Sequence, residues 1–341
     1  MTTPKPITLA LLLFVSSALP TWASVSVNNP ANESEVKSPF ALSANSESCS
    51  SEPVTSMSYS LDGNPDVEVL KGNSLETKVV SVPGTHTLHV KALGEKGSVC
   101  VSDIALTVKA DDAASAIVPG NATAVHSIQA LRNWIGMHDT GGSVSASGST
   151  SIVSSPSLNG GTRRFSTQFK GSGDERFSVS YADDKEAENF FYDAWVYIPS
   201  SSGPISNIEM DTNQVIASGQ TVILGVQCDG WSGTWTFTAN IGSPKHPRPH
   251  WEVAPGTRCD PESWTKNKWH HVQASYSRNS SGMVTYHSAW VDGVESVLNR
   301  TVPGAFDLGW GSDINTQFQI DGRGSSGSTT VYVDDLTISR W

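Results

Sequence analysis

The sequence predicts an all-β protein built from two successive β-sandwich units. Short runs that alternate apolar and polar residues recur between turn-forming Gly, Pro, Asn and Asp residues. No segment keeps an apolar period of 3.6 residues over three turns. The composition agrees with this class, because charged residues make up only 16% of the chain while Gly and Pro number 29 and 18.

Residues 1–23 have the pattern of a secretory signal peptide. Lys5 precedes the apolar run Ile7 to Val15, and Thr21-Trp22-Ala23 offers small residues for cleavage after Ala23. A short membrane anchor is the alternative, but the run is too short to cross about 30 Å of hydrocarbon. We therefore expect a protein that is secreted, periplasmic or held at the cell surface, with no membrane span.

The net charge of −11, which becomes −12 once Lys5 is removed, argues against nucleic acid as a partner. Four cysteines in an exported chain suggest disulfides, and their spacing favours Cys49 with Cys100 and Cys228 with Cys259 among three formal pairings. No Cys-x-x-Cys metal pattern is present.

The first unit is predicted to span residues 24–110. It holds about seven short strands, with turns at Asp62-Gly63 and Pro83-Gly84. The segment Asn28 to Asn32, followed by Val36 and Pro39-Phe40, resembles bacterial immunoglobulin-like modules of extracellular proteins. A sugar-binding platform usually offers exposed aromatic residues. In this unit Trp is absent after the signal and Tyr59 is the one Tyr, so the unit is interpreted as a spacer or presentation module.

Residues 111–119 are predicted to form a linker, and residues 120–341 a single large sandwich that holds ten of the 11 Trp. A short helix is considered for Ser127–Trp134. The ten predicted strands are Thr162–Phe169, Phe177–Tyr181, Asn189–Ile198, Ile205–Gln214, Thr221–Cys228, Thr234–Ala239, Trp269–Arg278, Met283–Val291, Thr316–Asp321 and Thr330–Ser339.

Four of these strands share one pattern, because one face is apolar and the other carries carboxylates, amides and aromatic rings but no Lys or Arg. A plain solvated face would normally carry several lysines. Amides and carboxylates suit sugar hydroxyls and flat rings suit stacking, so the pattern favours a carbohydrate-binding cleft over a plain solvated face. The residues predicted to line it are Asp193, Trp195, Tyr197, Glu209, Asp211, Asn213, Gln227, Gln317 and Gln319.

The segment between Cys228 and Cys259 is rich in aromatic and basic residues and is broken by several prolines. A disulfide would hold it as a rigid rim of the cleft, and a structural loop capping the sandwich edge is an equal alternative. The rim residues predicted to contact ligand are Trp231, Trp235, His250 and Trp251.

Three motifs, Trp269-His270-His271-Val272, Trp290-Val291-Asp292-Gly293 and Val331 to Leu336, resemble the concanavalin A-like lectin and glucanase jelly roll, including its laminin-G-like branch. The resemblance covers residues 120–341 and implies two antiparallel sheets with ligand on the concave one. It also implies a structural calcium near a final-strand Asp, which matches Asp334. No other cofactor is expected.

Glu209-x-Asp211 resembles the Glu-x-Asp strand of laminarinase-type glycoside hydrolases, in which the first Glu is the nucleophile and a later Glu is the acid/base. The later positions here are the amides Asn213 and Gln214, so Glu209 and Asp211 remain catalytic candidates that need a substitute acid. Asp193 and Asp321 are the two residues considered for that role.

Polysaccharide lyases of the alginate-lyase type share the jelly roll, and the residues cast in their roles are Gln227, His250, Arg248 and Tyr197. Their usual motifs are missing, and an acidic cleft suits a uronate poorly. The leading hypothesis is therefore a monomeric, secreted protein that binds a polysaccharide or other glycan. A polysaccharide-cleaving enzyme and a laminin-G-like adhesion module are the alternatives.

Overall fold

The computed structural model describes residues 25–63, 66, 68–79, 81, 84–109, 117–138, 146–158, 160–170, 173–324 and 326–341. The predicted signal peptide and most of the predicted linker lie outside these residues. Within the described part of the chain, no helix has the length and hydropathy needed to cross a membrane.

Strands β1 to β9 pair among themselves in two sheets. The smaller sheet has the order β1-β3-β7, and the larger has the order β2-β9-β8-β5-β4 with β6 beside β5. The disulfide between Cys49 and Cys100 forms as predicted. The bounds are β1 Ser26–Asn29, β2 Ser34–Lys37, β3 Phe40–Asn45, β4 Ser48–Cys49, β5 Glu52–Leu61, β6 Glu68–Lys71, β7 Ser74–Val79, β8 Gly84–Gly94 and β9 Val99–Lys109.

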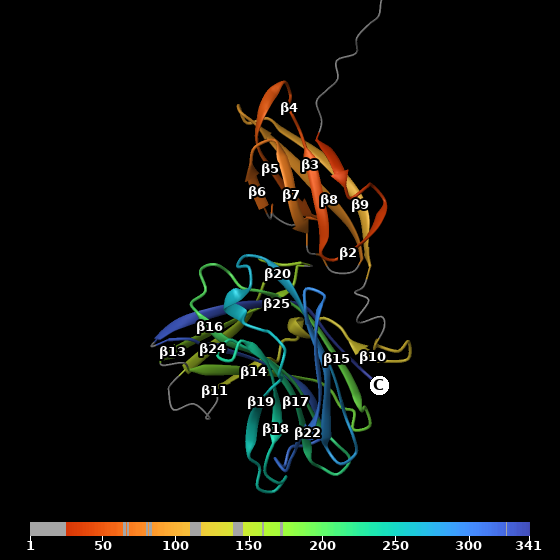
Figure 1. The fold of residues 1–341 in the computed structure, drawn as a ribbon, viewed down its shortest axis with the longest axis vertical. Coiled ribbons are helices and arrows are strands. Elements are labelled where there is room, and N and C mark those ends of the chain that lie inside the picture. Colours follow the sequence, from red (N-terminus) through yellow and green to blue (C-terminus); the bar gives the residue numbers. More distant parts are fainter. Residues whose placement is uncertain are drawn as a thin grey trace, which may run out of the picture. The chain divides into compact units, whose positions relative to one another are not determined.

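Strands β10 to β25 form a second sandwich of two eight-stranded sheets (Figure 1). The back sheet has the order β12-β13-β25-β15-β20-β21-β22 with β10 beside β25. The front sheet has the order β11-β14-β24-β16-β17-β18-β19 with β23 beside β17.

The bounds of the back-sheet strands are β10 Thr123–Val125, β12 Ala146–Val153, β13 Thr162–Lys170, β15 Asn189–Tyr197, β20 Trp269–Arg278, β21 Met283–Val291, β22 Val294–Pro303 and β25 Ser326–Arg340. Those of the front-sheet strands are β11 Ile135–His138, β14 Asp174–Ala182, β16 Ile205–Val215, β17 Thr221–Asp229, β18 Thr234–Asn240, β19 Pro249–Val253, β23 Ala305–Phe306 and β24 Ile314–Gly322.

The predicted all-β class is confirmed, and each of the ten strands predicted after residue 120 is present. The prediction missed six strands, namely β10, β11, β12, β19, β22 and β23. Of these, β12, β19 and β22 lie at sheet edges, are mostly exposed and carry little apolar alternation. The short helix considered for Ser127–Trp134 is a single 3-10 turn at Ile128–Ala130.

The core of this sandwich lies between the two sheets and takes every second residue of the central strands. Ile208 and Met210 of β16 pack there with Phe318 of β24, Val226 of β17 and Tyr276 of β20. Since these strands send their apolar side chains inward, the alternate residues of the front sheet all face away from the core. That outward surface carries the residues from which the candidate site is built.

Candidate functional site

The outward side of the front sheet is a continuous polar surface, which we call the polar face. Its strands are neighbours in the order β14-β24-β16-β17-β18, so alternate residues of each strand meet side by side. The polar face consists of Asp174, Arg176, Ser178, Asn207, Glu209, Asp211, Asn213, Gly225, Gln227, Thr236, Thr238, Asn315, Gln317, Gln319 and Asp321.

Glu209 lies at the centre of one cross-strand row. Gln319 of β24 is its partner on one side and Gln227 of β17 is its partner on the other. Arg176 extends the row beyond Gln319, and Thr236 extends it beyond Gln227. Directly opposed residues have Cβ atoms about 4.5–5.5 Å apart. A ligand over Glu209 would therefore also be within reach of two amides.

Asp211 lies two residues further along β16 and centres the next row. Gln317 of β24 opposes it on one side and Gly225 of β17 on the other. Side chains two residues apart on a strand point to the same face, so Glu209 and Asp211 are presented together. The structure thus brings together five of the predicted site residues, namely Glu209, Asp211, Gln227, Gln317 and Gln319, with Asn213 at the next position on β16.

Asp321 fixes the orientation of two amides at one end of this surface. Its Oδ2 accepts a hydrogen bond from Asn207 Nδ2 at 3.0 Å, and its Oδ1 accepts one from Gln319 Nε2 at 3.0 Å. An ionised carboxylate only accepts hydrogen bonds, so the NH₂ ends of Asn207 and Gln319 must face Asp321. Their carbonyl oxygens are consequently turned away from it.

A second carboxylate orients Asn213 through an intermediate amide. Asp313 Oδ2 accepts a hydrogen bond from Asn315 Nδ2 at 2.9 Å, and Asn315 Oδ1 in turn accepts one from Asn213 Nδ2 at 3.1 Å. This relay fixes the amide orientation of both asparagines. The carbonyl oxygen of Asn213 is the last atom of this hydrogen-bond relay.

The carbonyl oxygens of Asn207, Asn213 and Gln319 are buried and accept no hydrogen bond from the described residues. Asn213 is only 1% exposed and Gln319 only 5%. An unsatisfied buried acceptor costs about 1–3 kcal/mol. A donor that reached any of the three atoms would therefore lower the free energy.

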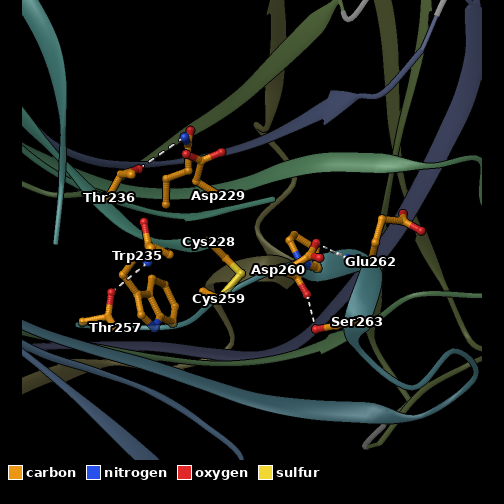
Figure 2. The surroundings of a disulfide bond; sticks show 12 residues. Cys228, Asp229, Trp235, Thr236, Thr257, Cys259, Asp260, Glu262 and Ser263 are labelled. Atoms are coloured by element: carbon orange, nitrogen blue, oxygen red, sulfur yellow. Dashed lines mark hydrogen bonds between the residues drawn. A yellow bond between two sulfur atoms is a disulfide. The ribbon is translucent and has the colours of Figure 1, made fainter. Parts of the chain in front are cut away.

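A disulfide holds the loops at the Asn207 end of the polar face. Cys228 of β17 is bonded to Cys259, as predicted, which closes a segment with a sequence separation of 31. Figure 2 shows Asp229 and Thr236 on one side of these strands, with Trp235 and the disulfide on the other side. The bridge therefore lies beneath the polar face and stabilises the loops from the core side.

The 3-10 turn Pro261–Ser263 follows this disulfide directly and fixes the start of β16. Asp260 caps the turn by accepting a hydrogen bond from the backbone N–H of Glu262 at 3.0 Å (Figure 2). Glu262 Oε1 then accepts the backbone N–H of Ile205 at 2.5 Å. The strand that carries Glu209 and Asp211 is thereby tied to the bridged loop.

An exposed tryptophan lies at this same end of the front sheet. Trp231, in the turn between β17 and β18, is 56% exposed, and the Arg323 guanidinium carbon lies 4.8 Å from its ring centroid. Asp229 Oδ1 accepts the backbone N–H of Trp231 at 2.9 Å, which fixes the turn. Trp251 of β19 opposes Thr238 and is half-buried on the polar-face side of the sheet.

The structure corrects the prediction that β15 belongs to the same surface. Asp193, Trp195 and Tyr197 lie on the outward side of the back sheet, so the whole core separates them from Glu209. Asp193 accepts hydrogen bonds from His271 Nε2 and Gln273 Nε2 there. Trp195 is 1% exposed and stacks on His271 at 4.3 Å, which leaves no ring face for a sugar.

Two predicted rim residues also face elsewhere. Trp235 packs in the core at 1% exposure, because it occupies the inward position of β18. His250 opposes Ala239 and so lies on the side of β19 away from the polar face. The four residues considered for a lyase are therefore not brought together, since Gln227 is on the polar face and Tyr197 is on the back sheet.

Asp334 does not have the surroundings expected of a calcium ligand, because hydrogen-bond donors already occupy both of its oxygens. These donors are Gln129 Nε2 and Asp335 N at Oδ1, and Ser157 Oγ, Leu158 N and Thr162 Oγ1 at Oδ2, at 2.7 to 3.2 Å. A bound Ca²⁺ needs oxygens in those places instead. Among the described residues, no group of three His, Cys, Asp or Glu side chains is placed to hold a metal.

Sequence reasoning missed several members of the polar face, among them two asparagines and two charged residues. Asn207 and Asn315 continue the alternation of β16 and β24 by one further position, so extending the pattern would have found them. Asp174 and Arg176 were missed because β14 begins three residues before its predicted start at Phe177. Arg176 also corrects the expectation that this surface carries no Lys or Arg.

A separate hollow of about 410 Å³ lies on the back sheet, lined in part by Ser147, Gln168, Lys170 and Ser328. Phe169 and Ala146 also line it, and none of the predicted site residues does. The candidate binding residues of this sandwich are concentrated instead on the polar face, where the amides have fixed orientations.

No family model matches the chain, and a search of the curated proteins found no match. Among solved structures, one of carbohydrate-binding modules from the β-sandwich superfamily is 10% identical and has a TM-score of 0.36. That alignment covers 93% of this chain and 98% of the other.

Two further structures are similar at the same level. The family 11 carbohydrate-binding module from Clostridium thermocellum, in complex with a β-1,3-1,4-mixed-linked tetrasaccharide, is 13% identical, with coverages of 64% and 94% and a TM-score of 0.29. The family 7 alginate lyase A1-II′ is 11% identical, with coverages of 55% and 81% and a TM-score of 0.31. Likenesses this low carry no argument about activity, and the β-sandwich assignment stands on the strand pairing described above.

Proposed function

We propose that this protein is exported and binds a polysaccharide through the polar face. The observation that carries the proposal is the set of three buried amide oxygens, on Asn207, Asn213 and Gln319, for which the described residues provide no hydrogen-bond donor. Sugar hydroxyls are hydrogen-bond donors spaced along an extended polysaccharide chain. The acceptors of the polar face are likewise spaced along extended strands. Trp231, exposed at one end of the sheet, supplies a ring for stacking.

Export is supported by the signal-like residues 1–23 and by two disulfides, which persist in oxidising compartments. Residues 24–110 are proposed to be an immunoglobulin-like module that presents the glycan-binding sandwich, with residues 111–119 as the linker. The acceptor role suits a binding protein because it needs no proton transfer. The protein is proposed to act as a monomer.

Affinity electrophoresis of the mature protein in gels that contain different soluble polysaccharides tests this function. We expect retardation by at least one glycan, and recovery of the glycan unchanged in length. Gln319→Ala should lower the affinity derived from the retardation by about tenfold, since the loss of one hydrogen-bonding side chain in a binding site costs about 1–3 kcal/mol. Failure to bind any glycan of a broad panel would refute the proposal.

Hydrolysis on the same surface is a second candidate, favoured by the carboxylates that surround Glu209. Asp211 is on the same strand, and Asp321 is diagonally placed on β24. Asp321 is held as an acceptor by two amides, however, and Asp193 is on the other sheet, so neither predicted substitute acid is well placed to donate a proton. Release of reducing ends from the glycan that binds would support hydrolysis.

A further inference from the structure

The polar face combines oriented acceptors with negative charge. Four of its residues are carboxylates, namely Asp174, Glu209, Asp211 and Asp321, whereas Arg176 is its one cation. Acidic residues alone do not define a site. The independent observation is that Asn213 and Gln319, both more than nine-tenths buried on this face, present carbonyl oxygens that no described donor satisfies.

Four amides on this surface each donate an N–H to a partner inside the protein. Asn207 and Gln319 donate to Asp321, Asn213 donates to Asn315, and Gln227 Nε2 donates to Thr236 Oγ1 at 3.3 Å. Three of them, Asn207, Asn213 and Gln319, also carry carbonyl oxygens that no described donor satisfies. A ligand that matches this surface must bring donors, and a positively charged donor forms stronger hydrogen bonds than a hydroxyl does.

The centre of the surface is the place where charge and acceptors coincide. Glu209 is flanked by Gln319 and Gln227, and Asp211 follows it on the same face of β16. Both carboxylates are nearly buried, at 7% and 3% exposure, so water screens them less than it screens a surface carboxylate. An ammonium group bound there would interact more strongly than it would at an open surface.

We propose that the polar face selects glycans made of amino sugars with free, protonated amines. This inference rests on the proposed function and names its ligand class. A neutral glycan supplies only hydroxyl donors to the same atoms. An N-acetylated glycan places a bulkier, uncharged group where the ammonium would lie, and a uronate polymer is repelled by the carboxylates.

The test compares three β-1,4-linked hexamers that differ only at carbon 2, with an ammonium, an acetamide or a hydroxyl: hexameric glucosamine, N-acetylglucosamine and glucose. Calorimetric titration of the mature protein at pH 6 and low salt should give at least about tenfold tighter binding of the glucosamine hexamer, the size expected for one charged hydrogen bond. The preference should shrink as salt is raised and as the pH rises above the pKa of the amine.

Glu209→Gln and Asp211→Asn remove charge while keeping the size of the side chain. Each should abolish most of the preference for the amine, measured as the ratio of the affinities for the glucosamine and glucose hexamers, because the charge that favours an ammonium is gone while neutral hydrogen bonding remains possible. Glu252→Gln is the matched control, since Glu252 lies on the opposite side of β19 and should change neither affinity. Circular dichroism melting would establish that each variant is folded.

Equal affinity for the three hexamers would overturn the inference and leave the proposed function standing. Binding of poly-L-lysine as tightly as the glucosamine hexamer would also overturn it, because the surface would then recognise charge without sugar. Binding of other glycans but none of the three hexamers would overturn it too. Only the absence of binding to every glycan would refute the proposed function itself.

Discussion

The carboxylate of Asp211 lies directly over the backbone of Gly225 on the neighbouring strand β17. A Cβ atom added at Gly225 would come within 2.3 Å of Asp211 Oδ1 and within 2.8 Å of the Thr238 methyl carbon. Real Cβ contacts are never so short, so the side chains on both sides occupy the space that the glycine leaves. The position of Asp211 on the polar face thus depends on a residue that has no side chain.

Gly225→Ala should push Asp211 and Thr238 apart. We expect a loss of about 1–3 kcal/mol in the free energy of unfolding, as for other insertions of a methyl group into a packed site. Glycan affinity should fall together with stability. Gly311→Ala is the control, because a Cβ there meets no atom within 4 Å and the backbone is not left-handed. Unchanged affinity in a folded Gly225→Ala protein would show that the position of Asp211 does not matter for binding.

Tyr286 contacts the backbone of Gly225 and Thr238 from inside the sandwich. It belongs to β21 of the back sheet, yet its hydroxyl accepts the Gly225 N–H at 3.1 Å and donates to the Thr238 carbonyl at 3.1 Å. Tyr286→Phe should cost about 1–3 kcal/mol in stability, because the Gly225 N–H and the Thr238 carbonyl each lose a buried partner. It should also weaken glycan binding, because both residues belong to the polar face.

Tyr276→Phe provides the comparison for Tyr286→Phe. The Tyr276 hydroxyl is also buried but bonds Thr212 Oγ1 at 2.7 Å on the core side of β16. Tyr276→Phe should lower the free energy of unfolding without changing glycan affinity. Equal losses of affinity in both variants, measured by titration, would mean that binding reports only general destabilisation.

Asp334→Asn should destabilise the sandwich by about 2–4 kcal/mol, because one of its fully engaged oxygens becomes an N–H that faces other donors. Chemical unfolding of the variant measures this loss. In contrast, a chelator should leave the unfolding curve of the native protein unchanged, since hydrogen-bond donors already satisfy the Asp334 carboxylate. A large stabilisation by added calcium that Asp334→Asn removes would restore the calcium-site hypothesis.

Asp335 provides a prediction about pH. Burial is the largest cause that raises the pKa of its carboxyl, and the nearby carboxylates of Asp193 and Asp334 act in the same direction. With the folded pKa above the unfolded value, the group favours the folded state when protonated and loses that contribution as the pH rises through the folded pKa.

Asp335→Asn should therefore raise the melting temperature at pH 7, and the difference from the native protein should narrow toward pH 4. Asparagine tolerates the left-handed backbone at this position, where φ is 48°. Asp307→Asn, at an exposed loop residue, is the control and should show no such trend. A variant that melts lower than the native protein at pH 7 would contradict the assigned electrostatic cost.

Alternation along each strand allowed the sequence to predict which side chains face away from the core, and it was correct for β16, β17 and β24. It was wrong for the placement of β15, because a strand of period two carries no information about which sheet it joins. The order β25-β15-β20 depends on contacts between segments far apart in the chain. Asp193, Trp195 and Tyr197 were therefore assigned to the wrong surface.

The hydrogen-bond relays were beyond sequence reasoning for a related reason. Asp313 could not be linked to Asn213, nor Asp321 to Asn207, until the register of β16 against β24 was known. A shift of one residue would have turned these side chains toward the core. The composition of the polar face was thus predictable in part, whereas the direction of its amides was not.

The most direct test of the central claim compares the two outward surfaces of the sandwich. Asn213→Ala removes an oriented acceptor from the polar face, and Tyr197→Ala removes an accessible ring from the back sheet. Titration with a glycan that the native protein binds should give about a tenfold loss of affinity for Asn213→Ala and no change for Tyr197→Ala. The reverse result, with affinity lost only in Tyr197→Ala, would contradict the account and place the binding site on the back sheet.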